Sequence, residues 1–192
     1  MALPSSEPER VPPIRAEDLR IEPFRETADV REFDCDCKEL KDFLTTAEVA
    51  DYEKKNLGKT YLVYWQPEGA LVAYFTISSD SLRFDYFKSV KSFSIPGEIR
   101  TNTIPGILIG RLAVDNRFKR RDVGTHLLRY IAGLALSAPA AARILFLEAY
   151  PSALDFYQRR GFITIEHQKL KKRRNRLIYF DLTTHPDWDG NR

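Results

Sequence analysis

The chain contains 192 residues, of which 43% are hydrophobic and 30% are charged, and its formal net charge is +3. These values are typical of a globular protein with one sizeable core, and the small net charge gives no overall electrostatic reason to expect nucleic-acid binding. No apolar run approaches the ~20 residues that span a bilayer, and the N-terminus lacks the apolar segment of a secretory signal. We therefore expect no membrane partner.

Residues 1–17 carry prolines among small and charged residues, and this composition predicts a flexible arm that buries little apolar surface. The prolines are Pro4, Pro8, Pro12 and Pro13. A first strand is expected around Leu19, Ile21 and Phe24, with Pro23 marking its edge or its end.

The next segment predicts a single amphipathic helix. Asp36 is the expected N-cap, and Glu39 is its expected capping-box partner three residues later. Apolar residues at helical spacing then predict one face that packs on the core, and Gly58 ends the pattern. These residues are Leu40, Phe43, Leu44, Ala47 and Ala50.

The two cysteines, Cys35 and Cys37, are separated by one residue, which makes them poor partners for a structural disulfide. The histidines lie far from them in the sequence, so no zinc-site spacing is present and no metal is expected. We expect reduced thiols in a cytoplasmic protein, with Cys35 packed as a small apolar residue.

Residues 60–65 and 70–77 are rich in β-branched and aromatic side chains and predict two strands joined by a turn over residues 66–69. Residues 80–105 are less regular, and their aromatic residues alternate with cations. We expect a loop or short helix whose aromatic side chains cover the edge of the core. The alternative is a lid on the substrate side of the protein.

Residues 107–115 form an apolar, β-branched run that predicts a buried strand, and a helical apolar pattern starts soon after it. The intervening turn is basic and contains Gly124. The first N–H groups of a helix have no partner and lie at the positive end of the helix dipole, so they suit a phosphate group. Lys119, Arg120 and Arg121 strengthen that preference. The turn is therefore a candidate anion-binding site.

The last third predicts a buried strand over residues 143–149, paired in parallel, and then a short helix with Ser152 as N-cap and Gly161 as its end. Two closing strands are expected over residues 163–166 and 177–182. Between them lies the basic segment, residues 169–176, with six cations in eight residues. A solvated hairpin is the ordinary interpretation of such a run, and nucleic-acid contact is the alternative. The alternation of strands and helices indicates a mixed α/β sheet.

The residues from Arg111 to Gly124 resemble the central motif of the GNAT N-acetyltransferases, whose turn reads Gln/Arg-x-x-Gly-x-Gly/Ala. The resemblance implies an α/β fold in one domain, with a mixed, mostly antiparallel central sheet flanked by helices. It also implies that acetyl-CoA is the co-substrate, with its pantetheine arm along the strand and its pyrophosphate on the turn. The residues implied are Leu112, Ala113, Val114, Lys119, Arg120, Arg121, Asp122, Val123, Gly124 and Thr125.

Asp122 stands where the family motif has its first glycine, and Lys119 stands where it has Gln or Arg. Aspartate lacks the conformational freedom of glycine but tolerates left-handed geometry better than most residues. Weakened acetyl-CoA binding is therefore the open alternative at this turn.

A narrower resemblance comes from a Phe-x-Cys-x-x-x-x-Leu-x-x-Phe-Leu segment, matched here by Phe33, Cys35, Leu40, Phe43 and Leu44. This segment resembles a GNAT branch that includes toxins acetylating aminoacyl-tRNA. The resemblance implies tRNA as a partner through the basic segment, and it leaves an antitoxin and a homodimer open as further partners.

Phe156-Tyr157 followed by Gly161-Phe162 resembles the family pattern Phe-Tyr-x-x-x-Gly-Phe. The resemblance implies that the acceptor amine attacks the thioester directly and that Tyr157 protonates the departing CoA thiolate. A phenol with a reference pKa near ~10 is protonated at neutral pH and can take that role. Glu148 and His126 are candidate bases, but water could also accept the proton of an aminoacyl α-amine, so the base stays open.

We therefore expect an acetyl-CoA-dependent N-acetyltransferase domain over residues 18–185, with an arm at 1–17 and a tail at 186–192. Acetylation of a protein or of a small amine is the alternative among enzymes. A non-catalytic binding module, with a phosphate site disabled by Asp122, is the alternative outside enzymes. The sequence leaves the acceptor and the oligomeric state open.

Overall fold

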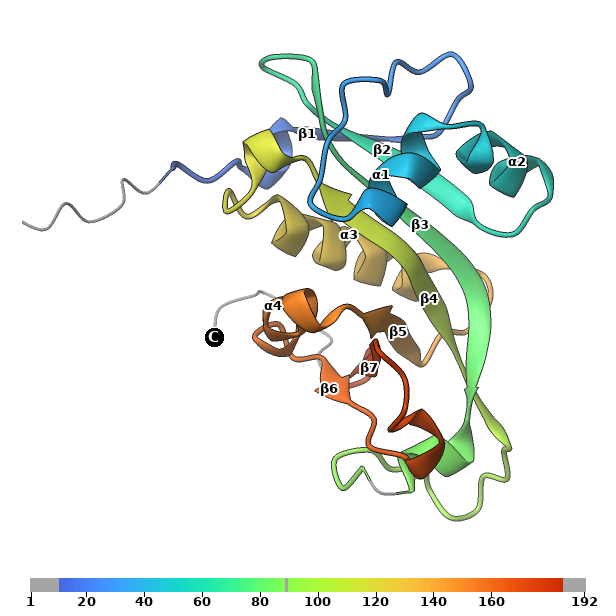
Figure 1. The fold of residues 1–192 in the computed structure, drawn as a ribbon. Coiled ribbons are helices and arrows are strands. Elements are labelled where there is room, and N and C mark those ends of the chain that lie inside the picture. Colours follow the sequence, from blue (N-terminus) through green and yellow to red (C-terminus); the bar gives the residue numbers. More distant parts are fainter. Residues whose placement is uncertain (1–10, 89, 185–192) are drawn as a thin grey trace, which may run out of the picture.

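The computed structural model describes residues 11–88 and 90–184, and one seven-stranded sheet crosses this part of the chain in the order β1-β2-β3-β4-β5-β7-β6 (Figure 1). Neighbouring strands pair antiparallel except for β4 and β5, which pair parallel. The expected mixed, mostly antiparallel sheet is thus confirmed. The strands are β1 (Leu19–Pro23), β2 (Lys59–Trp65), β3 (Ala70–Arg83), β4 (Thr103–Val114), β5 (Ile144–Ala149), β6 (Ile163–Thr164) and β7 (Arg176–Asp181).

Helices flank both faces of the sheet because successive residues of a strand point to opposite sides. On β2, Val63 packs in the core shared with α3, whereas Leu62 packs in the core shared with α1 and α2. The helices are α1 (Lys38–Thr45), α2 (Glu48–Lys54), α3 (Val123–Ser137) and α4 (Leu154–Gln158). Short 3-10 turns are η1 (Ala16–Asp18), η2 (Phe84–Phe87), η3 (Asn116–Phe118), η4 (Pro151–Ala153) and η5 (Gln168–Leu170).

The capping box predicted for the first helix is wrong. Cys37 is the N-cap of α1 and makes no side-chain cap hydrogen bond, and the chain leaves helical geometry at Thr46 before α2 begins. Asp36 instead forms an ion pair with Lys119, and Glu39 accepts a hydrogen bond from Tyr150. Both carboxylates are used by distant partners, so neither caps the helix.

The N-cap predicted for the last helix is also wrong. Ser152 lies inside η4, and α4 starts after Ala153 without a side-chain cap. The predicted end of this helix is confirmed, because Gly161 adopts a positive φ of 83°, a conformation that glycine takes without steric cost.

The β3–β4 hairpin is longer than the sequence pattern suggested, since β3 continues to Arg83 and β4 already begins at Thr103. Phe87 and Phe93 are buried beside Tyr179 in a core beneath this hairpin. The packing role expected for these aromatic residues is confirmed, and the lid alternative does not apply to them.

The described part of the N-terminal segment is packed against the domain. Ile14 is only 2% exposed and lies in the same core as α3, and its N–H donates to the carbonyl of Arg121 at 2.9 Å. Residues 11–17 therefore do not behave as the loose arm that the proline-rich composition suggested. Residues 1–10 of that predicted arm, and the tail predicted at 186–192, lie outside the described residues.

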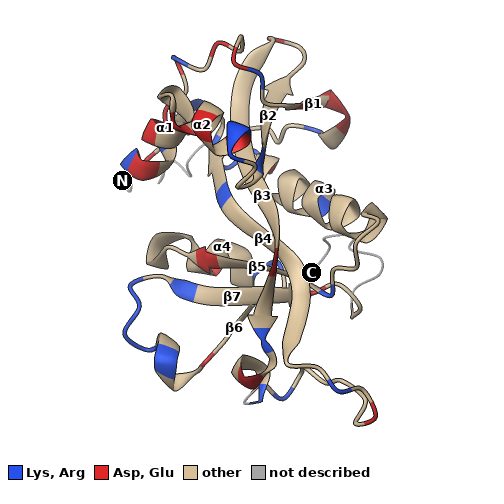
Figure 2. Ribbon diagram, turned by 90° about the vertical axis from the view of Figure 1, so that its right-hand side faces the viewer, with Lys and Arg blue, Asp and Glu red and all other residues tan. Residues whose placement is uncertain are grey.

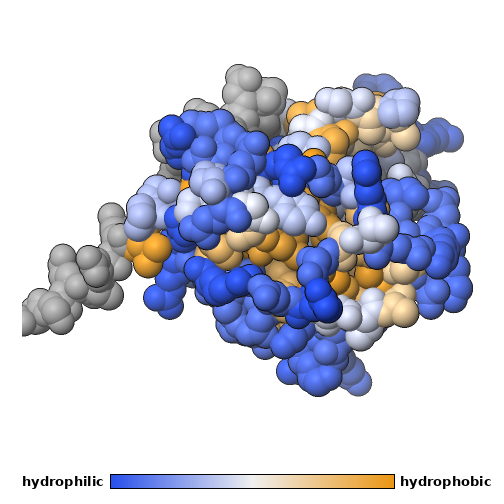
Figure 3. Space-filling model, turned by 90° about the horizontal axis from the view of Figure 1, so that it is seen from above, coloured by the Kyte–Doolittle hydropathy of each residue, from blue (hydrophilic) through white to orange (hydrophobic). Residues whose placement is uncertain are grey.

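Seen from above, hydrophilic residues cover most of the surface, and apolar residues show mainly in the middle of that face (Figure 3). No helix in the described part of the chain is long and apolar enough to cross a membrane. Within residues 11–88 and 90–184, no group of three or more His, Cys, Asp or Glu side chains is arranged to hold a metal ion.

Candidate functional site

The central feature of the site is the separation of β4 from β5. The two strands pair only at residues 106–108 and 144–146, and after Leu108 they diverge (Figure 1). A register shift between β3 and β4 leaves Gly110 as an extra residue on β4, and such bulges bend a strand. At the closed end, a Cβ on Gly106 would lie 2.5 Å from the carbonyl oxygen of Ile144, so glycine permits the close approach of the strands.

A cavity of about 1410 Å³, called the first cavity below, occupies the opening between the two strands. Residues 109–114 of β4, the first turns of α1 and α3, and α4 line it. Of the residues predicted from the sequence, all except Arg121 line this cavity: Leu112, Ala113, Val114, Lys119, Arg120, Asp122, Val123, Gly124, Thr125 and Tyr157.

The turn before α3 has the shape of an anion-binding site, which is called the cradle below. Arg120 and Asp122 adopt left-handed φ values of 60° and 62°, so Asp122 takes the conformation in which glycine was expected. The Asp122 carbonyl accepts the N–H of Thr125 at 3.0 Å, whereas no described group accepts the N–H of Val123 or Gly124. A Cβ at Gly124 would lie 2.9 Å from the ring of Phe156, so this position requires glycine.

The three cations of the turn have different surroundings. Arg121 points away from the first cavity, since its Nε donates to the Pro12 carbonyl at 3.0 Å and its guanidinium lies 4.5 Å from the centre of the Trp65 ring. Lys119 is ion-paired with Asp36. Among the described residues, Arg120 forms no ion pair. The side chain of Arg121 is therefore a brace for the turn, and only its backbone can contribute to the cradle.

Arg160 is a cation that the sequence patterns did not single out. Its Nε and Nη2 donate to Oγ1 of Thr125 at 2.8 and 2.6 Å, and its guanidinium lies 3.9 Å from the centre of the Phe156 ring. Burial lowers the pKa of Arg160, while the charge of Asp122 acts in the opposite direction. No carboxylate in the described part of the chain forms an ion pair with it. A cation three residues after Tyr157, in the turn that follows α4, was the available sequence signal.

Tyr157 is 5% exposed and lies between the rings of Phe156 and Phe162 in edge-on contacts. Burial raises the pKa of Tyr157, because a phenolate is poorly solvated there. The side chain is therefore neutral at physiological pH and keeps a proton to donate into the first cavity.

The two bases considered from the sequence are already engaged. Glu148 is ion-paired with Arg173, and Nε2 of His126 lies 3.0 Å from the Ile14 carbonyl oxygen. The structure thus pairs Glu148 with a cation. In His126 it directs Nε2 at a carbonyl, while Nδ1 is buried without a hydrogen-bond partner among the described residues.

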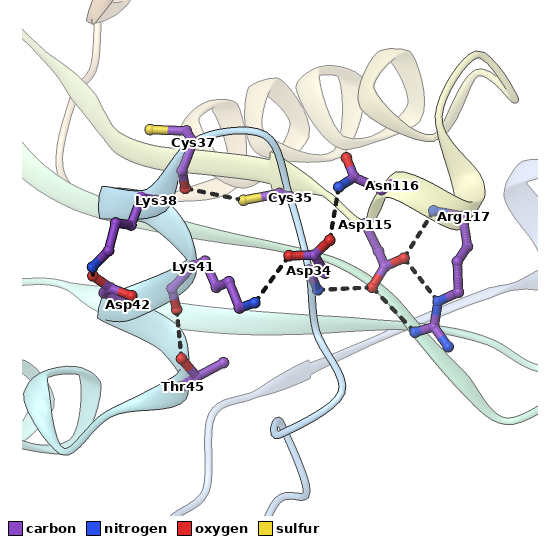
Figure 4. A network of polar contacts seen from close by, with 10 residues as sticks. All are labelled: Asp34, Cys35, Cys37, Lys38, Lys41, Asp42, Thr45, Asp115, Asn116 and Arg117. Atoms are coloured by element: carbon purple, nitrogen blue, oxygen red, sulfur yellow. Dashed lines mark hydrogen bonds and ion pairs between the residues drawn. The ribbon is translucent and has the colours of Figure 1, made fainter.

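A buried carboxylate holds the chain segment that leads into α1 (Figure 4). Asp115 is fully buried and accepts the backbone N–H and the Nε of Arg117, each at 2.9 Å, and the backbone N–H of Asp34 at 3.1 Å. Burial opposes ionisation, but the hydrogen bonds from Arg117 and Asp34 hold the pKa of Asp115 below its ordinary value. This network fixes the start of α1 over the end of β4, where Cys35 and Cys37 also line the first cavity.

A second cavity of about 840 Å³ meets the first along a shared wall. Arg111 belongs to this wall, where its guanidinium lies 3.5 Å from the centre of the Phe43 ring and 3.3 Å from a carboxylate oxygen of Glu48. The residues common to both cavities are Glu39, Leu40, Ile109, Gly110, Arg111, Glu148 and Tyr150.

The basic segment borders both cavities. It lies on the same side of the molecule as α1 and α4 (Figure 2). Arg173 and Asn175 line the second cavity, and Arg174 lines the first. The arrangement therefore places two cavities against one shared wall, the first beside a helix N-terminus and the second beside a run of cations.

Comparison with known proteins agrees with this geometry. A model of the acetyltransferase (GNAT) domain matches residues 34–177. The structure of AtaT complexed with acetyl-methionyl-tRNAfMet is 25% identical, with a TM-score of 0.70 over 88% of this chain and 98% of that chain. No curated protein sequence matches the chain.

Two further solved structures share the fold. A structure described as a bacterial toxin has a TM-score of 0.71 at 16% identity, over 86% of this chain and 92% of that chain. A mutant AtaT toxin bound to the C-terminus of the antitoxin AtaR and acetyl-CoA has a TM-score of 0.65 at 24% identity, over 87% and 95% of the two chains.

Proposed function

Because this chain belongs to the GNAT acetyltransferase family, we propose that the amine it acetylates is the α-amine of an aminoacyl-tRNA. The chain is an acyltransferase that uses acetyl-CoA as its co-substrate. The observation that carries the proposal is the meeting of the two cavities along the shared wall, with the basic segment beside them.

The residues of the first cavity fit acetyl-CoA. The backbone of Leu112, Ala113 and Val114 faces the opening where β4 has lost its partner strand, so its N–H and C=O groups can pair with the amides of the pantetheine arm. The free N–H groups of Val123 and Gly124, together with Arg120 and Arg160, suit the pyrophosphate. Acetyl-CoA supplies the activated acyl group.

The acceptor enters through the second cavity and attacks from the shared wall. Its amine nitrogen forms a bond to the thioester carbonyl carbon, and the carbon–sulfur bond breaks. Tyr157 gives its proton to the CoA thiolate, which is the better base once the bond to carbon is lost. Direct transfer of this kind needs both substrates bound together, which two connected cavities allow.

The choice of aminoacyl-tRNA has two supports. AtaT, at 25% identity and nearly full coverage, is complexed with acetyl-methionyl-tRNAfMet. In this chain, the exposed cations Lys171, Lys172 and Arg176 are neighbours in sequence of Leu170, Arg173, Asn175 and Leu177, which line the second cavity, and they have no ion-pair partner among the described residues. Free cations beside an acceptor entrance are suited to the phosphates of a tRNA acceptor stem.

The test measures acetyl transfer from labelled acetyl-CoA to a pool of charged tRNAs, with the variant Lys171→Gln/Lys172→Gln/Arg176→Gln. We expect the KM for charged tRNA to rise at least tenfold, while the affinity for acetyl-CoA, measured by isothermal titration, stays unchanged.

The matched control is Arg20→Gln/Arg25→Gln, which removes cations near β1 at the opposite edge of the sheet from β6. This control should behave like the wild type. If the triple variant acetylated charged tRNA with wild-type kinetics, the basic segment would not be the tRNA contact. Transfer to peptides or small amines, without transfer to any charged tRNA, would replace the proposed acceptor.

Three further proposals accompany this function. An antitoxin is a proposed partner because a mutant AtaT of similar fold is bound to the C-terminus of the antitoxin AtaR. A homodimer stays a prediction, and comparing the molar mass from light scattering with the 22.2 kDa of one chain tests it directly. A cytoplasmic location is proposed because acetyl-CoA and charged tRNA meet there.

A further inference from the structure

The shared wall contains two carboxylates, and they differ in their partners. Glu148 is neutralised by its ion pair with Arg173. Glu39, on the first turn of α1, has no lysine or arginine nitrogen of the described chain within ion-pair distance. Glu39 is therefore the one described carboxylate that faces both cavities without a cationic partner.

Glu39 is held in place by a hydrogen bond across the opening. The Tyr150 hydroxyl donates to Oε2 of Glu39 at 2.6 Å and thus joins α1 to the segment that follows β5. The hydrogen bond to Glu39, burial, and the contact with Cys37 all raise the pKa of Tyr150. Tyr150 consequently stays protonated and keeps donating, and no described residue is bonded to Oε1 of Glu39.

The other charged side chains around Glu39 are already paired, so they do not compete for it. On α1, Lys38 is paired with Asp42. On β4, Arg111 is paired with Glu48 from α2. From the other side, Arg173 of the basic segment is paired with Glu148 of β5. A cation that reaches the shared wall therefore meets Glu39 as its free counter-charge, since Asp80, which also lines the second cavity without a described cationic partner, does not belong to that wall.

We propose that Glu39 binds the ammonium form of the acceptor amine and is the general base of the reaction, with Tyr150 as its positioning residue. The ammonium first gives one proton to Glu39, which passes it to water in the open cavity. As the carbon–nitrogen bond forms and the carbon–sulfur bond breaks, the second proton leaves nitrogen by the same route. The CoA thiolate takes the proton of Tyr157, and Tyr157 regains a proton from water.

The assignment separates the two proton roles by environment. Tyr157 is buried among aromatic rings and is fixed as an acid, whereas Glu39 lies at the solvent-open wall and can release a proton to water. Such a division between a buried acid and a more exposed base is a common arrangement for acid–base pairs. The inference rests on the proposed transfer of acetyl to an amine, but it does not require that the amine be carried by tRNA.

The test compares Glu39→Gln with Asp51→Asn, using methionyl-tRNA and methionine methyl ester as parallel acceptors. Asp51 is a suitable control because it is an exposed carboxylate on the neighbouring helix α2 and lines neither cavity. We expect Glu39→Gln to lower kcat/KM at pH 7 by roughly 100-fold on whichever acceptor the wild type uses. Acetyl-CoA affinity should stay unchanged, and Asp51→Asn should remain within about threefold of wild type.

The pH profile distinguishes a base from a structural side chain. An α-amine has a pKa near ~8, so free amine becomes abundant at higher pH and needs no help to lose its first proton. The deficit of Glu39→Gln should therefore shrink between pH 7 and pH 9. Tyr150→Phe should show a smaller loss with the same trend, because the carboxylate is present but less well placed.

The outcomes separate this inference from the proposed acceptor. Wild-type kinetics in Glu39→Gln, or a loss that is constant with pH, would overturn the role of Glu39 while leaving the acceptor proposal intact. Transfer to methionine methyl ester but not to methionyl-tRNA would overturn the tRNA proposal, and the same two variants would still decide the role of Glu39 on the ester.

Discussion

At the scale of single residues, the site depends on side chains whose surroundings set their charge. Tyr157 is kept neutral by burial, and Arg160 is a half-buried cation supported by Thr125 and the Phe156 ring. Asp122 adopts a left-handed φ of 62°, the conformation in which glycine was expected. The chemistry of the site is therefore assigned to individual groups that can be replaced one at a time.

Tyr157→Phe should lower kcat by about 100-fold, because phenylalanine retains the ring packing but has no proton for the CoA thiolate. The affinity for acetyl-CoA should remain within about twofold, since the rings of Phe156 and Phe162 still enclose the side chain. Single-turnover transfer and isothermal titration measure the two quantities. A wild-type kcat would show that water protonates the thiolate.

Arg160→Gln should weaken acetyl-CoA binding roughly tenfold or more, because a charge-assisted contact contributes about 1.5–3 kcal/mol. Arg31→Gln is the control, since Arg31 lines neither cavity and its side chain is 85% exposed in a surface pair with Asp29. Isothermal titration with acetyl-CoA checks both variants. Equal affinities for the two would remove Arg160 from the anion site.

At the scale of elements, the site is a gap between the parallel strands β4 and β5, which are hydrogen-bonded at one end only. The bulge at Gly110 opens β4 away from β5. At the closed end, Arg143 donates from Nε and Nη2 to the two oxygens of Asp181, each at 2.8 Å. This bidentate pair ties the start of β5 to the end of β7 and so fixes the strand from which the gap begins.

Asp181→Asn should lower the free energy of unfolding by roughly 2–3 kcal/mol at pH 7. Burial opposes ionisation of Asp181, but the bonds from Arg143 and Thr183 hold its pKa below the ordinary value. The ionised carboxylate of Asp181 thus makes its full contribution to the free energy of unfolding above ~3.9, the pKa of an aspartate in the unfolded chain. That contribution is lost as the pH falls through the lower pKa of Asp181 in the folded protein. The difference between variant and wild type should therefore shrink below pH 4 in urea titrations.

A suitable comparison for that experiment is Asp29→Asn, which removes an exposed carboxylate paired with Arg31. The urea midpoint of this control should match that of the wild type at pH 7. A difference between Asp181→Asn and the wild type that stayed constant from pH 7 to pH 3 would contradict the assigned pKa direction.

The N-terminal segment is a second element that supports the site. Ile14 donates to the Arg121 carbonyl, its own carbonyl meets His126, and Pro12 accepts from Arg121. Ile14→Ala should cost about 2–4 kcal/mol of stability, because it empties a nearly fully buried position. Val11→Ala, at a position that is 55% exposed, should change stability by less than ~0.5 kcal/mol.

The same pair of variants tests whether the segment braces the turn. Acetyl-CoA affinity should fall in Ile14→Ala and stay at the wild-type value in Val11→Ala, as measured by isothermal titration below the unfolding range. Loss of stability with unchanged affinity would show that the segment serves the fold and not the cradle.

At the scale of the whole molecule, two cavities of about 1410 and 840 Å³ meet at the opening between β4 and β5. The net charge of +3 is small, but cations are concentrated in the basic segment (Figure 2). Arg173 and Asn175 of this segment line the second cavity. Association with a polyanionic acceptor should therefore depend on the local electrostatic field of the basic segment and not on the net charge of the whole chain.

The kcat/KM for charged tRNA should fall steeply with salt, because each phosphate contact releases bound counterions. Lys171→Gln/Lys172→Gln/Arg176→Gln should reduce the slope of log kcat/KM against log salt concentration by about 2, at ~0.7–0.9 per lost contact. Methionine methyl ester carries no phosphate, so its kcat/KM should show little salt dependence. An unchanged slope in the variant would place the tRNA on another surface.

The sequence by itself determined the features that are local in the chain. The apolar run at 107–115, the glycine turn before α3, and the Phe-Tyr pattern around Tyr157 each occupy neighbouring residues, so their spacing predicts their structure. The strands around residues 60–65 and 70–77 were likewise predicted from composition. The family resemblance, which rests on these same local motifs, is confirmed by the match over residues 34–177.

Only the tertiary structure decided which side chains meet across the sheet. Glu39 and Tyr150 are 111 positions apart, Ile14 and His126 are 112 apart, and Thr125 and Arg160 are 35 apart. The helix caps predicted at Asp36 and Ser152 were wrong for a related reason. A carboxylate or hydroxyl bonds to whichever partner the fold brings within about 3 Å, and local spacing does not contain that distance. The cavities and the free carboxylate between them follow from packing, which the order of residues does not show.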